Sequence, residues 1–330
     1  AGGKIIFPGL INTHVHSFQT LLKGLETDTG LDLWLENVIS PSVAAVNEEE
    51  VYYGSVLSAL DALRSGTTTI TDYQYAQYLY GLNTAAVKGY RDIGIRLVYA
   101  RGFADTGIQF GANPAELESI EAIDAGMRRL LSEFPAEFGG GVTIAMAPSA
   151  VWMCSPELLE WAADFSREHG LMVTSHIAET EYDNECSREV HGCSDFEACE
   201  KYGLIQKRML MVHCVQLTEG EIRRAAEYGA GFSYNPVSNM YLASGAAPIQ
   251  TIRQYGLPGS FGTDGAASNN SNDMLETIKA GILQAKTCYR DPMVFTAMDA
   301  LEYATISGAR VLGHEDEIGS IEAAKKTTLF

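Results

Sequence analysis

The sequence predicts an α/β fold of the (β/α)8 barrel type, in which eight parallel strands alternate with helices. Three observations support this prediction: short apolar segments recur along the chain, helix signals stand between them, and 330 residues suit one large barrel. A doubly wound open sheet is the alternative that the same alternation allows. The count of eight strands favours the barrel over the open sheet.

Eight segments are expected to form buried parallel strands, because each is short, apolar and bounded by glycine or polar residues. They cover residues 4–14, 67–73, 95–103, 142–152, 171–179, 209–215, 230–239 and 257–265. We expect their carboxyl ends to share one rim, where barrel enzymes carry their chemistry.

Two of the helices between these strands have clear start signals. Asn113 and Pro114 predict a helix start at which Glu116 completes a capping box, and apolar residues follow at helical spacing. A second helix is expected over residues 155–170, where a Ser-Pro start and a His-Gly end frame an apolar face.

The composition limits the class of partner. A net charge of −19 opposes binding to nucleic acid or to an anionic membrane, since both carry phosphate charge. No apolar run of about 18 residues occurs, and the six cysteines include no C-x-x-C pair. These features favour a cytoplasmic protein with reduced thiols that acts on a small molecule.

Unusual polar residues stand where several of the predicted strands end. His14 and His16 end the first strand, His176 the fifth, His213 the sixth and Asp264 the eighth. Side chains alternate along a strand, so the H-x-H pair points both rings to one face. With His176 and Asp264 the pair forms a ligand set that suits Zn²⁺, with Fe²⁺ or Mn²⁺ as further candidates. Four histidines that are separately satisfied in the core are the alternative.

Five motifs in order resemble the amidohydrolase superfamily: PGLINTHVH, SHIAETE, VHCVQLTEGEI, SYNPVSNMYLASG and GTDGAASNNSNDM. More narrowly, they resemble its branch that deaminates or dechlorinates aromatic heterocycles. The resemblance implies a metal-dependent hydrolase barrel over residues 1–316. It also implies that residues 317–330 start the returning segment of a small flanking β-sandwich, most of which is absent from this chain.

The resemblance assigns roles to the strand-end residues. It implies that His14, His16, His176 and Asp264 bind the metal. Relatives with two metal ions carry a bridging lysine on the fourth strand, and residues 142–152 contain no lysine. The resemblance therefore implies one divalent metal ion, with zinc as the first candidate.

The chemistry implied for this site is hydrolytic. A metal ion lowers the pKa of a bound water, so that hydroxide can attack the ring carbon that bears an amino group or a halide. Asp264 is expected to accept the proton of the water, and Glu179 to protonate the neighbouring ring nitrogen. His213 is expected to orient the hydroxide and to stabilise the tetrahedral intermediate. The alternative for Glu179 is an ordinary surface carboxylate.

Five residues are candidates for contacts with the substrate: Gln19, Trp34, Arg101, Asn235 and Ser268. Gln19 offers a donor and an acceptor for a ring edge, and a loop hydrogen bond is its alternative. Trp34 could stack on a ring or belong to the core. Arg101 could hold a carbonyl or carboxylate, or form a structural ion pair. Asn235 and Ser268 are either rim residues or turn formers.

The function that these observations favour is a metal-dependent hydrolytic deaminase of an aminated N-heterocycle such as a purine, pyrimidine, pterin or triazine. The alternatives are a triazine dechlorinase, a deaminase of adenosine derivatives such as S-adenosylhomocysteine or methylthioadenosine, a cyclic-amide hydrolase, and a non-catalytic metal-bound scaffold. Neither nucleic acid nor membrane is expected as a partner. The resemblance implies a homo-oligomer.

Overall fold

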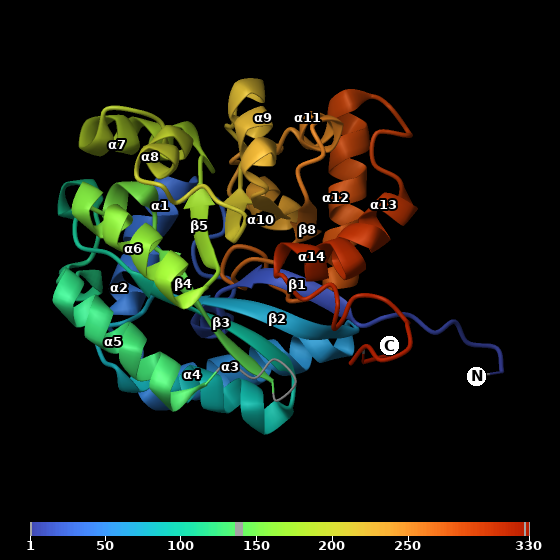
Figure 1. The fold of residues 1–330 in the computed structure, drawn as a ribbon, viewed down its shortest axis with the longest axis horizontal. Coiled ribbons are helices and arrows are strands. Elements are labelled where there is room, and N and C mark those ends of the chain that lie inside the picture. Colours follow the sequence, from blue (N-terminus) through green and yellow to red (C-terminus); the bar gives the residue numbers. More distant parts are fainter. Residues whose placement is uncertain (1, 136–140, 327, 330) are drawn as a thin grey trace.

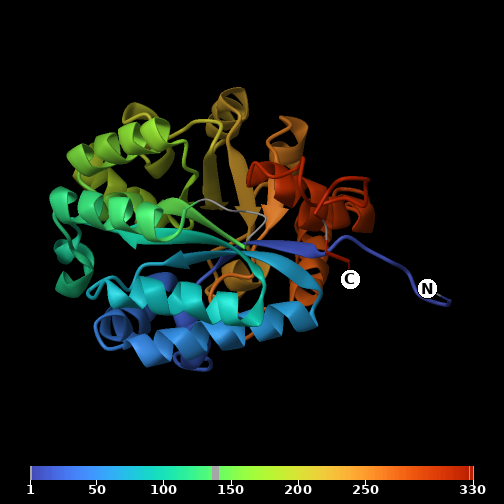
Figure 2. The ribbon, with the colours of Figure 1, turned by 60° about the horizontal axis from the view of Figure 1, so that its bottom comes forward.

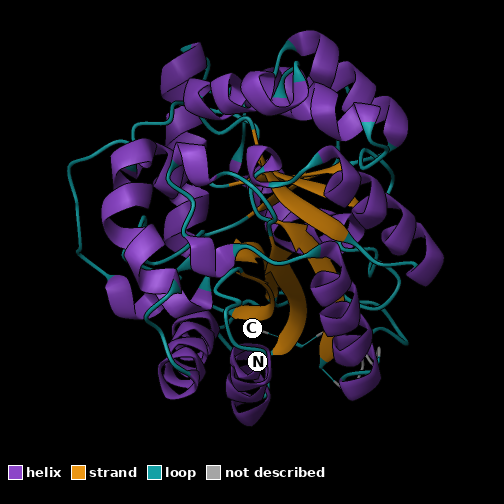
Figure 3. Ribbon diagram, turned by 90° about the vertical axis from the view of Figure 1, so that its left-hand side faces the viewer, coloured by secondary structure: helices purple, strands orange, loops and turns teal. Residues whose placement is uncertain are grey.

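The computed structural model of the chain describes residues 2–135, 141–326 and 328–329. Its eight strands are parallel and follow one another in chain order around a closed barrel, in which β1 also pairs with β8. Helices surround the strands on the outside (Figure 3). The barrel prediction is therefore confirmed, and the open sheet is excluded.

The strands coincide in number and order with the predicted segments (Figure 1). Their bounds are β1 Leu10–Val15, β2 Thr67–Gln74, β3 Arg96–Phe103, β4 Val142–Pro148, β5 Val173–Ile177, β6 Met209–His213, β7 Gly231–Tyr234 and β8 Gly259–Phe261. Several predicted segments were too long, because each included the loop that carries the polar strand-end residues.

Most helices lie between successive strands, as a (β/α)8 barrel requires. The α-helices are α1 Leu31–Trp34, α2 Ser40–Val43, α3 Glu48–Arg64, α4 Gly81–Ile93, α5 Ile120–Glu133, α6 Pro156–His169, α7 Glu181–His191, α8 Asp195–Lys201, α9 Glu219–Tyr228, α10 Pro236–Tyr241, α11 Ile249–Gln254, α12 Met274–Tyr289, α13 Ala297–Glu302 and α14 Gly308–Val311. The 3-10 turns are η1 Ser17–Leu22, η3 Ile108–Phe110, η4 Pro114–Glu116 and η6 Val151–Met153, and the π-helical turns are η2 Leu35–Ile39 and η7 Tyr303–Ser307.

The long helices α3 and α4 lie side by side and cover the strands β2 and β3 (Figure 2). The interior of the barrel below the site is polar where β1, β7 and β8 meet. Thr13 Oγ1 lies 2.9 Å from Ser233 Oγ and 2.7 Å from Ser260 Oγ, and all three side chains are fully buried. These hydrogen bonds fix the register of β1 and so the height at which His14 leaves the strand.

The two helix predictions had different outcomes. The predicted helix at residues 155–170 is confirmed: α6 begins after Ser155, whose side chain accepts from Leu158 N–H, and ends at the left-handed Gly170. The helix predicted to start at Pro114 is wrong. Only the short turn η4 forms there, because Leu117 has an extended backbone, and α5 begins after the cap residue Ser119.

The strand predicted over residues 230–239 ends early. β7 stops at Tyr234, and α10 begins at Pro236, which needs no backbone partner at the first position of a helix. Asn235 therefore belongs to a strand–helix junction, and Asn239 to a helix.

The two described ends of the chain lie close together. Gly9 N–H donates to Thr328 O at 2.8 Å, and Pro8 and Leu329 form an antiparallel bridge. The proposed division at residues 316 and 317 stays a prediction. Within the described ranges, no helix has the length and apolar character needed to cross a membrane.

Candidate metal centre and active site

Three histidine rings from two strands meet at the carboxyl rim of the barrel. The rings of His14 and His16 stand 4.6 Å apart between centroids, and that of His176 from β5 is 5.0 Å from His14. His176 Nε2 lies 3.2 Å from His16 Nε2. The ligand atoms of these three residues thus lie close enough to share one ion.

Backbone carbonyls fix the orientation of two of these rings. His16 Nδ1 lies 2.7 Å from Tyr73 O, and His176 Nδ1 lies 3.0 Å from Ser149 O. A carbonyl oxygen only accepts, so each Nδ1 carries a proton, and Nε2 is the nitrogen of each ring that can bind a metal ion. Burial, followed by the neighbouring histidines, holds the pKa of His176 well below its usual value. Two Nε2 atoms that face one another are expected where a cation binds between them.

His14 provides a second indication of a cation-binding site. It is fully buried, its Nδ1 has no hydrogen-bond partner in the described part of the chain, and its Nε2 faces the carboxylate of Asp264 at 3.3 Å. Burial, together with the nearby His16, lowers its pKa to about 3, so the ring is neutral and its lone pair is free.

Asp264 completes the donor set from the end of β8. Its Oδ1 lies 3.3 Å from His14 Nε2 and 3.2 Å from His16 Nε2. Its φ of 65° is left-handed, and its N–H donates to His14 O at 3.0 Å, which holds the side chain toward β1. Burial acts to raise the pKa of Asp264, but the facing histidines outweigh it and hold the pKa well below its usual range. Three imidazoles and an ionised carboxylate fit a divalent metal ion.

Glu179 and His213 lie beside this donor set. His213 Nε2 stands 3.4 Å from Glu179 Oε2 and 3.8 Å from Asp264 Oδ2, and its Nδ1 contacts Asn239 Oδ1 at 2.8 Å. Burial acts to lower the pKa of His213, but the two carboxylates outweigh it and raise the pKa. Ser244 Oγ donates to Glu179 Oε1 at 3.0 Å.

The carboxyl of Glu179 is adapted to hold a proton near neutral pH. Burial raises its pKa to about 7, although the charge of His213 opposes the shift. A buried acid with such a pKa can both give and take a proton, which a surface carboxylate of ordinary pKa does poorly.

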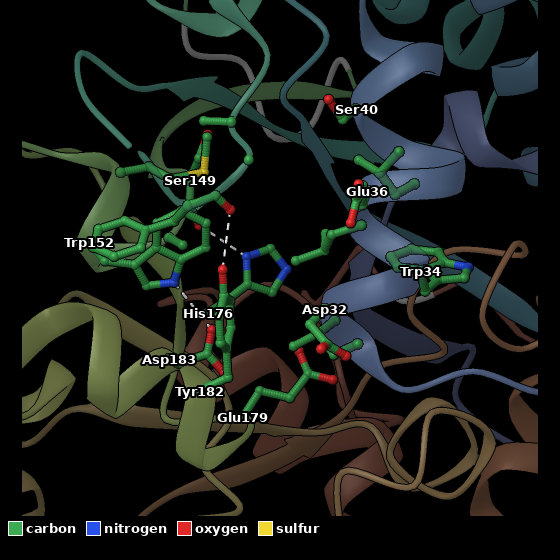
Figure 4. Close-up of a pocket in the computed structure, with 18 of the residues that line it drawn as sticks. Asp32, Trp34, Glu36, Ser40, Ser149, Trp152, His176, Glu179, Tyr182 and Asp183 are labelled. Atoms are coloured by element: carbon green, nitrogen blue, oxygen red, sulfur yellow. Dashed lines mark hydrogen bonds between the residues drawn. The ribbon is translucent and has the colours of Figure 1, made fainter. Parts of the chain in front are cut away.

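A cavity of about 510 Å³ opens above these residues. His16, His176, His213, Glu179 and Asp264 line its inner end. Aromatic side chains line its walls: Trp34, Tyr75, Phe110, Trp152 and Tyr182. Figure 4 shows Trp34 and its neighbours on one side of the cavity, with Trp152 and Tyr182 on the opposite side. The volume and the aromatic walls are typical of a site for a flat small molecule.

Three of the predicted substrate contacts line this cavity: Gln19, Trp34 and Ser268. Gln19 donates from Nε2 to Tyr75 Oη at 2.6 Å, while its buried Oε1 has no partner in the described residues. A Cβ at Gly265 would stand 1.8 Å from Gln19 Oε1, so only glycine leaves this amide its place.

The other two predicted contacts are not brought to the cavity. Arg101 NH2 binds both oxygens of Glu118, at 2.7 and 2.8 Å, and the guanidinium lies beside Gly126 of α5. The geometry is that of the structural ion pair we gave as its alternative. Asn235 accepts from Ser233 Oγ at 3.0 Å within the strand–helix junction and is absent from the cavity wall.

The position of Arg101 leads to a stability prediction. We expect Arg101→Met to lower the free energy of unfolding by about 3 kcal/mol, because it leaves the mostly buried Glu118 without its cation. KM should stay unchanged. Arg128→Met, which breaks the more exposed pair with Asp124, is the control and should cost less than about 1 kcal/mol. Chemical denaturation measures the stability of each variant, and steady-state kinetics measures its KM. A raised KM with unchanged stability would indicate that Arg101 contacts the substrate and does not form a structural ion pair.

Several residues of the site had not been predicted as such. The carbonyls of Tyr73 and Ser149 carry no residue-type signal, because any residue can supply them. Tyr75 had a usable signal, since it follows Tyr73 by two residues, just beyond the end of β2. Glu116 was assigned to a capping box with Asn113; its carboxyl has a backbone hydrogen bond with Asn113, and the residue also lines the cavity.

The sequence matches a known protein family over nearly its whole length. Residues 5–330 match the model of the Amidohydrolase family. The chain belongs to this family. A 5-methylthioadenosine/S-adenosylhomocysteine deaminase of Symbiobacterium thermophilum is 37% identical over 332 residues, which are 100% of this chain and 73% of the relative. A 5'-deoxyadenosine deaminase of Methanothermobacter thermautotrophicus is 36% identical over 94% of this chain and 70% of its own length.

Solved structures agree with the amidohydrolase fold. An adenosine deaminase from Xanthomonas campestris with bound zinc has a TM-score of 0.86 at 30% identity, covering 98% of this chain and 71% of that one. An atrazine chlorohydrolase from Arthrobacter aurescens has a TM-score of 0.91 at 24% identity, over 98% and 75% of the two chains, which shows likeness of fold alone. The predicted family and branch of this amidohydrolase are confirmed.

Proposed function

We propose that this amidohydrolase removes the exocyclic amino group from an aminated N-heterocycle by hydrolysis. The reaction uses one divalent metal ion, for which zinc is the first candidate. The observation that carries the proposal is Glu179, a buried carboxyl with a pKa raised to about 7 beside the histidine–aspartate donor set. The deaminases among its relatives and the zinc in the Xanthomonas campestris structure support the same reading.

His14, His16, His176 and Asp264 would hold the metal through three Nε2 atoms and a carboxylate oxygen. The bound ion supplies one thing, a lowered pKa for a coordinated water. The absence of a lysine on β4 supports a single ion.

The remaining steps are proton movements by residues of this chain. The Asp264 carboxylate is ionised and able to take up the proton that the attacking water loses. Glu179 gives a proton to the ring nitrogen next to the reacting carbon, so that this carbon accepts the nucleophile. His213, held by Asn239 and with a pKa that its two carboxylate neighbours raise, stabilises the oxygen that adds to the ring. The amino group takes the proton held by Asp264 and leaves as ammonia. As the C=O bond of the product forms, the hydroxyl on the ring carbon gives its proton back to Glu179.

The substrate that we propose to test first is a 6-aminopurine nucleoside without a 5'-hydroxyl. The curated relatives at 36–37% identity are deaminases of 5-methylthioadenosine, S-adenosylhomocysteine and 5'-deoxyadenosine. The aromatic walls and the acceptor of Gln19 suit a flat ring with N–H groups.

A product screen tests the proposed function. Metal-loaded protein is given aminated purines, pyrimidines, pterins and triazines together with chlorinated triazines, and both ammonia and chloride are measured. We expect ammonia from at least one aminated ring. Release of chloride without ammonia would show that the protein is a dechlorinase and not a deaminase. If no ring is turned over, both proposed activities are refuted.

A further inference from the structure

The cavity above the donor set has an unbalanced charge. Six acidic residues line it: Asp32, Glu36, Glu116, Glu179, Asp183 and Asp264. Among the described residues, no lysine or arginine lines it. Away from the histidines of the donor set, the ionisable groups that a ligand meets in this space are mainly carboxyl groups.

Three of these six carboxyl groups already have a role, either in the proposed catalysis or in structural hydrogen bonds. Glu179 and Asp264 belong to the proposed catalytic machinery. Asp183 accepts from Thr180 N–H and Oγ1, both at 2.8 Å, and from Trp152 Nε1 at 3.2 Å. These contacts cap α7 and hold a wall of the cavity, so Asp183 is satisfied without a ligand.

Glu116 is the exception inside the cavity. It is 7% exposed, and its carboxyl has no ion pair and no side-chain hydrogen bond to any described residue. Burial raises its pKa to about 8, although its carboxyl has a backbone hydrogen bond with Asn113, which acts to lower the pKa. Arg101, the arginine at the carboxyl end of β3, is already paired with Glu118. A buried carboxyl without a cation is costly in a folded protein, so it requires an explanation.

Asp32 and Glu36 face the same space from the segment α1–η2. Both are exposed, and neither side chain has a hydrogen bond or ion pair within the described ranges. Figure 4 shows them on the side of the cavity opposite Trp152 and Tyr182. They add two exposed carboxyl groups to the buried carboxyl of Glu116 in the lining of the same cavity.

We propose, on the basis of the proposed deaminase function, that the natural substrate carries a cationic group (ammonium, amidinium or guanidinium) apart from its reacting ring, and that Glu116 binds this group. Asp32 and Glu36 attract the same charge at the mouth. A substrate cation next to Glu116 supplies the ion-pair partner that no described side chain provides, and the pair is shielded from water. Substrates with an anionic arm are disfavoured, since the arm would lie beside the carboxyl groups of Glu116, Asp32 and Glu36.

The test compares three substrates that share one ring and differ only in the substituent, here called the arm, that each carries. The ring is the one turned over fastest in the product screen, with 6-aminopurine nucleosides altered at the 5' position as the first choice. The arms are guanidinium, methyl and sulfonate, and sulfonate is used because it is a poor metal ligand. We expect kcat/KM to be about tenfold higher for guanidinium than for methyl, and about a hundredfold higher than for sulfonate. High salt should reduce the differences in kcat/KM between the three arms, because it screens charge interactions.

Glu116→Gln identifies the residue responsible. The variant keeps the shape of the side chain, and we expect it to lower the ratio of kcat/KM for the guanidinium arm to kcat/KM for the methyl arm by about tenfold. Glu121→Gln, which removes an equal charge from the exposed face of α5, is the matched control and should retain the preference. Thermal melting checks that both variants fold.

Binding provides a readout that needs no turnover. The oxo products with the same three arms are titrated against the tryptophan fluorescence of the cavity, where Trp34 and Trp152 report occupancy. If the arm order holds in binding while no ring is turned over, the deaminase function fails and the charge preference stands. If the sulfonate arm binds as well as guanidinium, or Glu116→Gln changes neither binding nor kcat/KM, the preference is overturned even in an active deaminase.

Discussion

The Glu179→Gln variant is expected to retain its metal and its affinity for substrate while ammonia release falls by about a thousandfold. The amide keeps the size of the side chain and its contact with Ser244, but it has no proton to deliver at neutral pH. The ring nitrogen then stays unprotonated, and the reacting carbon resists attack. Single-turnover ammonia release, metal analysis and product binding together measure this result.

The control for this prediction lies two residues further on. Glu181→Gln removes a carboxylate from the exposed first turn of α7, and activity should stay within about twofold of the unaltered protein. If Glu179→Gln retains activity within about tenfold, Glu179 does not carry the proton. If the variant loses its metal, the contact between Glu179 and His213 has a structural role instead.

Removal of the metal should abolish activity and lower stability together. The Nε2 atoms of His16 and His176 face one another at 3.2 Å, and the Nε2 of the buried His14 faces the carboxylate of Asp264 at 3.3 Å. A cation bound between these groups satisfies the metal-binding nitrogens, so a bound ion stabilises the folded state. At a free zinc concentration about a thousand times the dissociation constant, the gain is about 4 kcal/mol. Thermal melting before and after chelation, and after zinc is restored, measures it.

Histidine variants show where this effect arises. His16→Gln should remove both the activity and the rise in Tm that zinc produces. His169→Gln, at the end of α6 and outside the cluster, is the control and should retain both. A zinc-dependent rise in Tm that survives His16→Gln would place the ion elsewhere.

Local signals in the sequence were sufficient where one segment decides its own structure. The start of α6 follows from Ser155, because a cap and the amide it binds lie within three residues. The pairing of the rings of His14 and His16 follows from the period of two along a strand. The same kind of evidence misled at Asn113, where the motif of a helix start forms only the turn η4. An isolated bridge between Leu117 and Ala104 holds the chain extended there, and that contact is tertiary.

What the sequence by itself determined is the barrel, the family, and the residue types at the carboxyl ends of the strands, since these depend on patterns repeated along the chain. The tertiary structure alone decided which partner each polar group has. Closure of the barrel brings the carbonyls of Tyr73 and Ser149 to the histidines, and the packing of the segment before α5 places Glu118 against Arg101. The same packing leaves Glu116 buried and unpaired in the cavity. Charges pair by distance in space, which no spacing along the chain encodes, and the charge preference of the site depends on that pairing.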